Sequence, residues 1–336
     1  MRNFILISIA IFFGLNSCKQ GTINGVIINY SDSTLSKQIL NLSEKIKKEP
    51  KNHEYYYLRA NEWTKSNRNE EAMIDISAAL ILDKENAVYM YKKADLMMAK
   101  DSVDIQSAAE LLEKAIKTAP NFEDAIFLLG KIKLARQEYE SALAKFDELI
   151  LIDPNNAKAH FYKGLAFKEN NFLDKAEEMF FKSKEIDNNY YDAYMQLGII
   201  YEKKDPKLAR GFYNNAIRIN PDSDEANYAL GMINQQQNQY KDAYQFYKQA
   251  LTLNPGHRFA AYSSAFIDVK FENYEKALST LDKIILLDPN YTNAMNLRAF
   301  TYEKMNDKAM AKSNYKKVLE INPKDSLANI GLKLLN

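Results

Sequence analysis

Small and bulky residues recur along this chain at one period. Eight alanines mark it, and the steps between them are 36, 34, 34, 33, 34, 34 and 34 residues. These alanines are Ala72, Ala108, Ala142, Ala176, Ala209, Ala243, Ala277 and Ala311. A bulky residue follows each alanine by four positions and a mostly apolar residue by seven, so all three share one face of a helix. A fixed period in the thirties predicts stacked copies of one supersecondary unit.

A second series of small residues precedes the alanines and predicts another helix in each copy. Its members are Ala60, Ala94, Gly130, Gly164, Gly198, Gly231, Ala265 and Ala299. The gap to the following alanine is 12 residues in six copies, 14 in the second and 11 in the fifth. Since an insertion inside a helix would rotate every later side chain, the variation marks turns, at residues 100–106 and 203–206. Each copy is therefore expected to be a helix, a turn and a second helix, with the small residues where the helices approach closely.

Prolines mark the ends of most copies. Seven share one register just after the second helix: Pro50, Pro120, Pro154, Pro221, Pro255, Pro289 and Pro323. The proline ring and its missing N–H stop further winding at that point. The eighth, Pro206, lies in the shortened turn of the fifth copy.

The copies resemble tetratricopeptide repeats. The residues that carry the resemblance in one copy are Leu197, Gly198, Tyr201, Ala209, Tyr213, Ala216 and Pro221. The resemblance implies an all-α fold, a right-handed α-solenoid of about eight helix-turn-helix units over residues 53–325. The units are expected at 53–86, 87–122, 123–156, 157–190, 191–223, 224–257, 258–291 and 292–325.

Both ends of the repeat array are expected to carry a capping helix, because the terminal repeats would otherwise expose their apolar sides. In residues 34–52 the apolar stripe consists of Leu35, Ile39, Leu42 and Ile46. In residues 326–336 Ser326 is expected to be the N-cap, and the buried face is expected to hold Leu327, Ile330 and Leu334.

The first 17 residues predict a secretory signal, since a charged start precedes a 12-residue apolar run from Phe4 to Leu15. Cys18, the single cysteine of the chain, follows directly, with Leu15 three positions before it and Ser17 one before it. This setting resembles the lipobox of bacterial lipoproteins, although Asn16 departs from the usual Ala, Ser or Thr. The resemblance implies that Cys18 is lipidated and becomes the new N-terminus; the alternative is an ordinary signal peptide with a chance cysteine.

Residues 18–33 then predict a lipidated tether that keeps the solenoid near the membrane. The cysteine is followed by Lys19, Gln20 and Gly21, without the aspartate that resembles an inner-membrane retention signal in some bacteria. The expected location is the cell envelope, at the outer membrane and facing the periplasm.

In the family that these repeats resemble, the second, fifth, ninth and twelfth positions of each first helix line a concave groove. Apolar residues at these positions are Tyr57, Tyr91, Phe127, Phe161, Leu165, Met195, Ile199, Tyr228, Met232, Phe259, Tyr262, Phe266 and Phe300. A groove lined in this way suits a peptide with apolar anchors. The alternative is that the fifth-position aromatics serve packing within the repeats, whereas the apolar ninth positions are less generic.

Composition argues against other classes of protein. The 45 basic and 44 acidic residues balance, so no electrostatic footprint for nucleic acid is expected. The three histidines fall in different repeats, and no metalloprotease, serine-hydrolase or phosphate-loop motif occurs. We therefore expect no enzyme activity, no metal and no cofactor.

Two hypotheses of function follow. The first is a membrane-tethered, non-catalytic scaffold that holds one or more proteins or peptides in an envelope assembly. The second is a carrier or sensor that captures a peptide or a glycan fragment in its groove.

Overall fold

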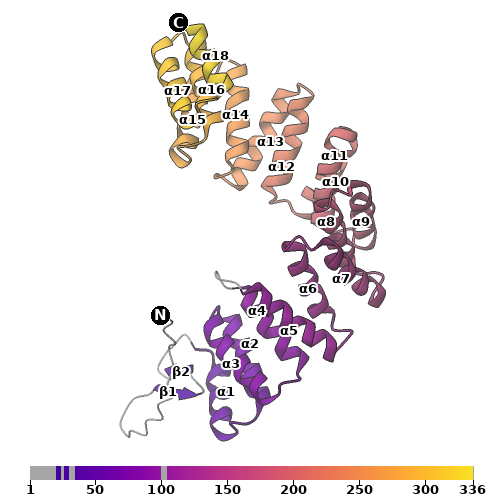
Figure 1. The fold of residues 1–336 in the computed structure, drawn as a ribbon. Helices are drawn as coiled ribbons and strands as arrows, with labels where there is room; N and C mark the ends of the chain where they lie inside the picture. The colour runs from indigo at the N-terminus through magenta and orange to yellow at the C-terminus, as the bar shows by residue number, and fades with distance from the viewer. Residues whose placement is uncertain (1–19, 24–25, 30–34, 100–103, 336) are drawn as a thin grey trace. The chain divides into compact units, whose positions relative to one another are not determined.

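The computed structural model describes residues 20–23, 26–29, 35–99 and 104–335. The chain divides into two units, Met1–Asn155 and Asn156–Asn336, each of which is built from paired antiparallel helices (Figure 1). Both units confirm the all-α solenoid that the period predicts.

The first unit holds a capping helix and three repeats. Its helices are α1 (Lys37–Lys48), α2 (His53–Lys65), α3 (Asn69–Leu82), α4 (Ala87–Met98), α5 (Ile105–Thr118), α6 (Glu123–Ala135) and α7 (Tyr139–Ile152). An antiparallel hairpin, β1 (Gln20–Ile23) and β2 (Val26–Asn29), precedes them, with β1 approaching α1 and β2 approaching α3. This hairpin lies within residues 18–33, the segment that we expected to be a lipidated tether.

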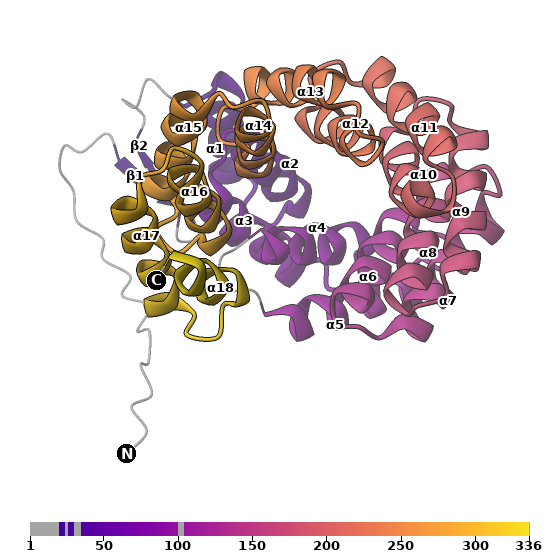
Figure 2. The same ribbon diagram turned by 90° about the horizontal axis from the view of Figure 1, so that it is seen from above.

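The second unit holds five repeats and a last helix. Its helices are α8 (Ala157–Glu169), α9 (Leu173–Ile186), α10 (Tyr191–Lys204), α11 (Pro206–Ile219), α12 (Asp224–Gln236), α13 (Tyr240–Leu253), α14 (Arg258–Lys270), α15 (Tyr274–Leu287), α16 (Thr292–Lys304), α17 (Lys308–Ile321) and α18 (Ser326–Leu335). Within this unit α10 and α12 lie on the inner side of the curve and α11 and α13 on its outer side (Figure 2). The first helices of these two repeats thus lie on the same side of the unit.

The turns inside the repeats confirm the two predicted length changes. Six repeats close their turn with one residue in the left-handed region, at φ between 57° and 63°, and four of these six residues are asparagine, which tolerates that region well. The other two turns differ in length: α4 ends at Met98 and α5 begins at Ile105, whereas only Asp205 separates α10 from α11. Asp205 also caps α11, since its carboxylate accepts hydrogen bonds from the backbone N–H groups of Lys207 and Leu208.

The small residue of each first helix lies against the bulky residue of the second. A Cβ atom added to Gly130 would lie 2.8 Å from the Phe146 ring, and one added to Gly164 would lie 2.7 Å from the Phe180 ring. Gly198 and Gly231 face the rings of tyrosines in the same way. Where the partner position holds Ile or Leu, the first helix carries Ala instead, as in Ala60, Ala94 and Ala265, all fully buried. The close approach of the two helices therefore depends on a size match at this contact.

The last repeat departs from this rule and explains the orientation of α18. It pairs Ala299 with Tyr315, and the Tyr315 ring lies against Gly331 of α18, where a Cβ would clash with three ring atoms. The buried residues of α18 are therefore Ala328 and Gly331, which leave room for that ring.

Two predictions about α18 are consequently wrong. Leu327, Ile330 and Leu334 are 61%, 56% and 77% exposed, so they do not form the buried face. Ser326 is the first helical residue, and the carboxylate of Asp325 caps the helix by accepting a hydrogen bond of 2.9 Å from the N–H of Ala328.

The N-terminal cap agrees with the sequence. Ile39, Leu42 and Ile46 of α1 are buried against the first repeat, and the Ser36 hydroxyl caps the helix at the N–H of Ile39.

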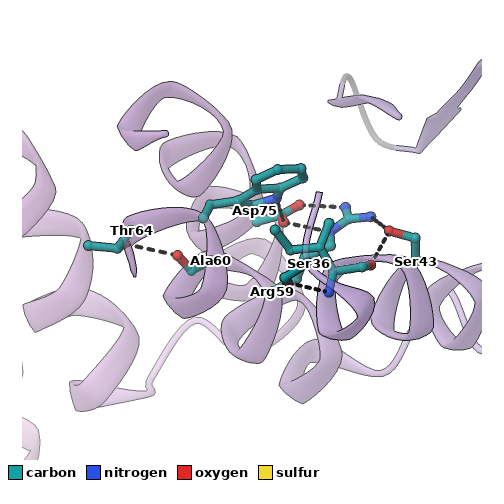
Figure 3. Close-up of polar contacts among 8 residues, drawn as sticks. Ser36, Ser43, Arg59, Ala60, Thr64 and Asp75 are labelled. Atoms are coloured by element: carbon teal, nitrogen blue, oxygen red, sulfur yellow. Dashed lines mark hydrogen bonds and ion pairs between the residues drawn. The ribbon is translucent and has the colours of Figure 1, made fainter. Parts of the chain in front are cut away.

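A buried ion pair joins this cap to the first repeat (Figure 3). The guanidinium of Arg59 on α2 donates two hydrogen bonds of 2.7 Å to the carboxylate of Asp75 on α3 and one of 3.0 Å to the hydroxyl of Ser43 on α1. The indole of Trp63 donates a further hydrogen bond of 3.0 Å to Asp75. Both charged side chains are completely buried, so the pair is sustained by its hydrogen bonds. In the last repeat Arg298 donates to Asn314 at the same two repeat positions.

We predict that Gly164→Ala destabilises the second unit by about 1–3 kcal/mol, because the added methyl group overpacks the contact with Phe180. Gly211→Ala is the matched control, since no atom lies within 4 Å of its added Cβ and alanine is the better helix former. Chemical denaturation followed by circular dichroism measures both. Equal unfolding midpoints for the two variants would contradict the size match.

We predict that Asp75→Ala lowers the free energy of unfolding of the first unit by about 3–5 kcal/mol, because it leaves the Arg59 charge buried without a partner. Trp63 is the single tryptophan and contacts Asp75, so its fluorescence reports this transition. Glu62→Ala removes the exposed pair with Lys65 and is expected to cost under about 1 kcal/mol. A loss no larger for Asp75→Ala than for Glu62→Ala would disprove the role of the buried pair.

Candidate protein-binding surface

Six of the eight fifth positions of the first helices hold rings, and these rings pack inside the repeat array. Tyr57 contacts Tyr89, Tyr91 contacts Phe122, Phe127 contacts Phe146, Tyr228 contacts His257 and Tyr262 contacts Tyr291, with ring centroids 4.8 to 6.3 Å apart. Each partner ring lies on the second helix of the same repeat or at the start of the next. These contacts favour the local-packing interpretation for the fifth-position aromatics.

Two residues predicted to line the groove are buried. Phe161 is 5% exposed, between the rings of Phe180 and Tyr190, and Met195 is 9% exposed in the same core. A partner cannot reach them without opening the core, so we remove both from the candidate surface.

The ninth positions of the first helices in the second unit carry side chains that are exposed or half-buried. Ile199, Phe266 and Phe300 are 46%, 37% and 39% exposed, and Leu165 and Met232 are half-buried. They occupy the same place in five consecutive first helices of the second unit, so they form a row across neighbouring helices. Large apolar side chains that stay exposed at one repeated position indicate a surface that a partner covers.

Phe259, at the second position of α14, adds to this row and is 46% exposed. The guanidinium of Arg258 lies 4.9 Å from the centroid of its ring.

A pocket of about 450 Å³ opens between α14 and α16, at the end of the row. Its lining includes Phe266, Phe300, Leu297, Val269, Lys270 and Lys304. The ammonium group of Lys304 lies 5.0 Å from the centroid of the Phe300 ring, so a positive charge borders the apolar floor. The pocket can therefore hold an apolar side chain next to a negatively charged group.

Polar groups beside the row keep one protonation state at neutral pH. Burial raises the pKa of Tyr228 and of Tyr262 above the ordinary value for a phenol. Both hydroxyls therefore remain protonated and able to donate a hydrogen bond.

The two lysines were not singled out by the sequence reasoning. They occupy the thirteenth position of two consecutive first helices, directly after the positions that were considered. Extending the comparison of equivalent repeat positions by one residue would have found them.

Each histidine serves a local structural purpose or lies in the core. The ring of His53 is hydrogen-bonded to the Tyr89 hydroxyl at 2.8 Å, and the His257 ring accepts the N–H of Ala260 at the start of α14. His160 is buried on α8. Over the part of the chain that the structure describes, no three acidic, histidine or cysteine side chains are grouped to hold a metal ion.

The predicted lipid attachment at Cys18 lies outside the described residues, as does the predicted signal segment. Among the helices that the structure does describe, none has the length and apolarity to cross a bilayer.

The paired helices, the capping helix at each end and the row of exposed apolar side chains define a helical-repeat protein with a surface for a partner. Family models described as tetratricopeptide repeat match residues 96–166, 201–258, 235–299 and 292–325, more than half of the chain. The chain belongs to the tetratricopeptide repeat family. Its repeats are those of protein–protein interaction scaffolds.

Relatives and solved structures agree with this assignment. The rat mitochondrial import receptor subunit TOM70 is 27% identical over 210 residues, which are 60% of this chain and 33% of that protein. The chain thus matches about a third of the length of this relative.

Among solved structures, pilF of Pseudomonas aeruginosa covers 62% of this chain and 95% of its own at 21% identity, with a TM-score of 0.56. The APC/C Cut9–Hcn1 structure covers 91% of this chain and 64% of its own at 14% identity, also with a TM-score of 0.56. These two similarities support the solenoid fold.

Proposed function

We propose that this protein is a non-catalytic scaffold of the bacterial cell envelope, anchored through a lipid on Cys18, that holds a protein partner on the surface of its first helices. The observation that carries the proposal is the row of exposed apolar ninth positions, which ends in the pocket between Phe266 and Phe300. Packing does not require these rings to be exposed, whereas a partner with apolar anchors does.

The sequence supports the anchor and the comparisons support the binding role. The apolar run that ends at Leu15, shortly before Cys18, is typical of a lipoprotein signal. The residues after Cys18 lack the aspartate that resembles an inner-membrane retention signal, which favours the outer membrane. A relative that is named as an import receptor subunit is in keeping with a partner that is itself a protein.

We predict that Phe266→Asp/Phe300→Asp reduces the recovery of specific envelope proteins about tenfold or more, because two apolar contacts are replaced by charged carboxylates that apolar anchors of a partner cannot cover without a desolvation cost. The full-length protein is crosslinked in native membranes and purified, and the partners are identified by mass spectrometry.

The matched control is Phe172→Asp/Phe271→Asp, which changes two phenylalanines that are 50% and 46% exposed at turns inside their repeats. The proposal is overturned if both double variants retain the partners or lose them equally. A small ligand retained by the purified chain, without a stable protein partner, would support the carrier instead.

We predict that Cys18→Ala leaves export intact and releases the protein from the membrane fraction, because stable attachment then lacks its acyl chains. Fractionation of cells that express each form measures this. An exported Cys18→Ala protein that still sediments with membranes would contradict the lipid anchor.

A further inference from the structure

The helix α18 has the register of the first helix of a repeat. It begins at Ser326, 34 residues after Thr292, where α16 begins, and it contacts both α16 and α17. At its eighth position, which holds Gly or Ala in all eight repeats, it carries Lys333. Among the described residues no second helix packs against this position, and Lys333 is exposed there.

The three faces of α18 have different characters. One face is buried and holds Ala328 and Gly331 against the last repeat. The side that would receive a further second helix carries Asn329 and Lys333, both exposed and polar. The third face carries only large aliphatic side chains, as Leu327, Ile330 and Leu334 are exposed.

The aliphatic face falls on the positions that line the groove. Counting from Ser326, Leu327, Ile330 and Leu334 are the second, fifth and ninth residues of α18. Helix α16 contacts both α14 and α18, so the three first helices follow one another along the surface. Leu334 therefore continues the row of Phe266 and Phe300 onto one more helix, beyond the pocket.

The charged residues that line the pocket are mainly basic. Lys270 and Lys304 border the pocket, their ammonium groups lie over aromatic rings, and within the described residues neither forms an ion pair with a carboxylate. One acidic residue, Glu272, also lines the pocket, so the lysines outnumber it. Carboxylates on a partner would be attracted to this border, while its apolar residues would be received by the row.

We propose that α18 is the terminal part of the binding surface, and that Leu327, Ile330 and Leu334 together with Phe266 and Phe300 bind an acidic peptide segment of the partner through apolar anchors. Neighbouring helices are about 10 Å apart, so anchors in adjacent subsites have that spacing. The proposal rests on the proposed function and adds the chemistry of the partner and the far end of the surface.

The polar character of the stacking side argues against two other occupants. A further repeat, or a second copy stacked end to end, would have to bury the ammonium group of Lys333 at the position that holds Gly or Ala in all eight repeats. A peptide in the groove leaves Lys333 in water.

The test uses a library of random peptides displayed on phage and selected on the purified full-length protein. Enriched peptides are synthesised with a fluorophore, and their affinities are measured by fluorescence polarisation. We expect peptides in which Asp or Glu accompanies apolar residues. We expect Ile330→Asp to weaken their binding about tenfold or more, Asn329→Asp to leave it within about twofold, and Ile330→Leu to retain it.

Other outcomes separate this inference from the proposed function. Peptides that respond to Phe266→Asp but equally little to Ile330→Asp and Asn329→Asp would overturn the role of α18 and keep the groove. Enrichment of basic peptides would overturn the acidic partner. Peptides insensitive to all these changes, or no enriched peptides, would overturn both proposals. A dimer of the wild-type protein in sedimentation that Ile330→Asp dissociates would assign the face to self-association instead.

Discussion

The contact between the eighth residue of a first helix and the bulky residue of its second helix sets the distance between every pair of helices. In seven of the eight repeats Gly pairs with a ring and Ala pairs with Ile or Leu, so the combined size of the two side chains stays similar. The last repeat, with Ala299 and Tyr315, is the exception. Because a repeat touches only its neighbours, this spacing determines which residues of the first helices remain outside the core. The ninth positions lie outside this contact, and Ile199, Phe266 and Phe300 are exposed there.

Much of the fold could be predicted from the sequence because a period repeated eight times averages out local exceptions. Helix pairs, both irregular turns and the N-terminal cap agree with the structure. The prediction for α18 failed because it assigned the largest residues to the core, whereas the Tyr315 ring requires Gly331 there. The Arg59–Asp75 pair was missed since it occurs in one repeat only, and the hairpin of β1 and β2 since its segment has no repeat to compare with.

The candidate surface was predictable in outline and not in detail. Equivalent positions identify which side chains point away from the second helices, but exposure depends on the neighbouring rings, which differ from repeat to repeat. Phe161 and Met195 are covered by an aromatic-rich core around α8 to α10, while Ile199 on the same helix as Met195 is not. The sequence pattern alone therefore does not distinguish the first-helix residues that pack in the core from those that are exposed.

The six left-handed turn residues affect how the number of repeats in this chain can change during evolution. Their nearly identical geometry, at φ between 57° and 63°, makes six of the eight repeats alike at their turns. Loss or duplication of one whole repeat in the gene would keep the contacts inside each remaining repeat and change those at the new junction. The binding surface can therefore become longer or shorter by one first helix at a time. Proteins descended from this one could then bind partners of different length with the same fold.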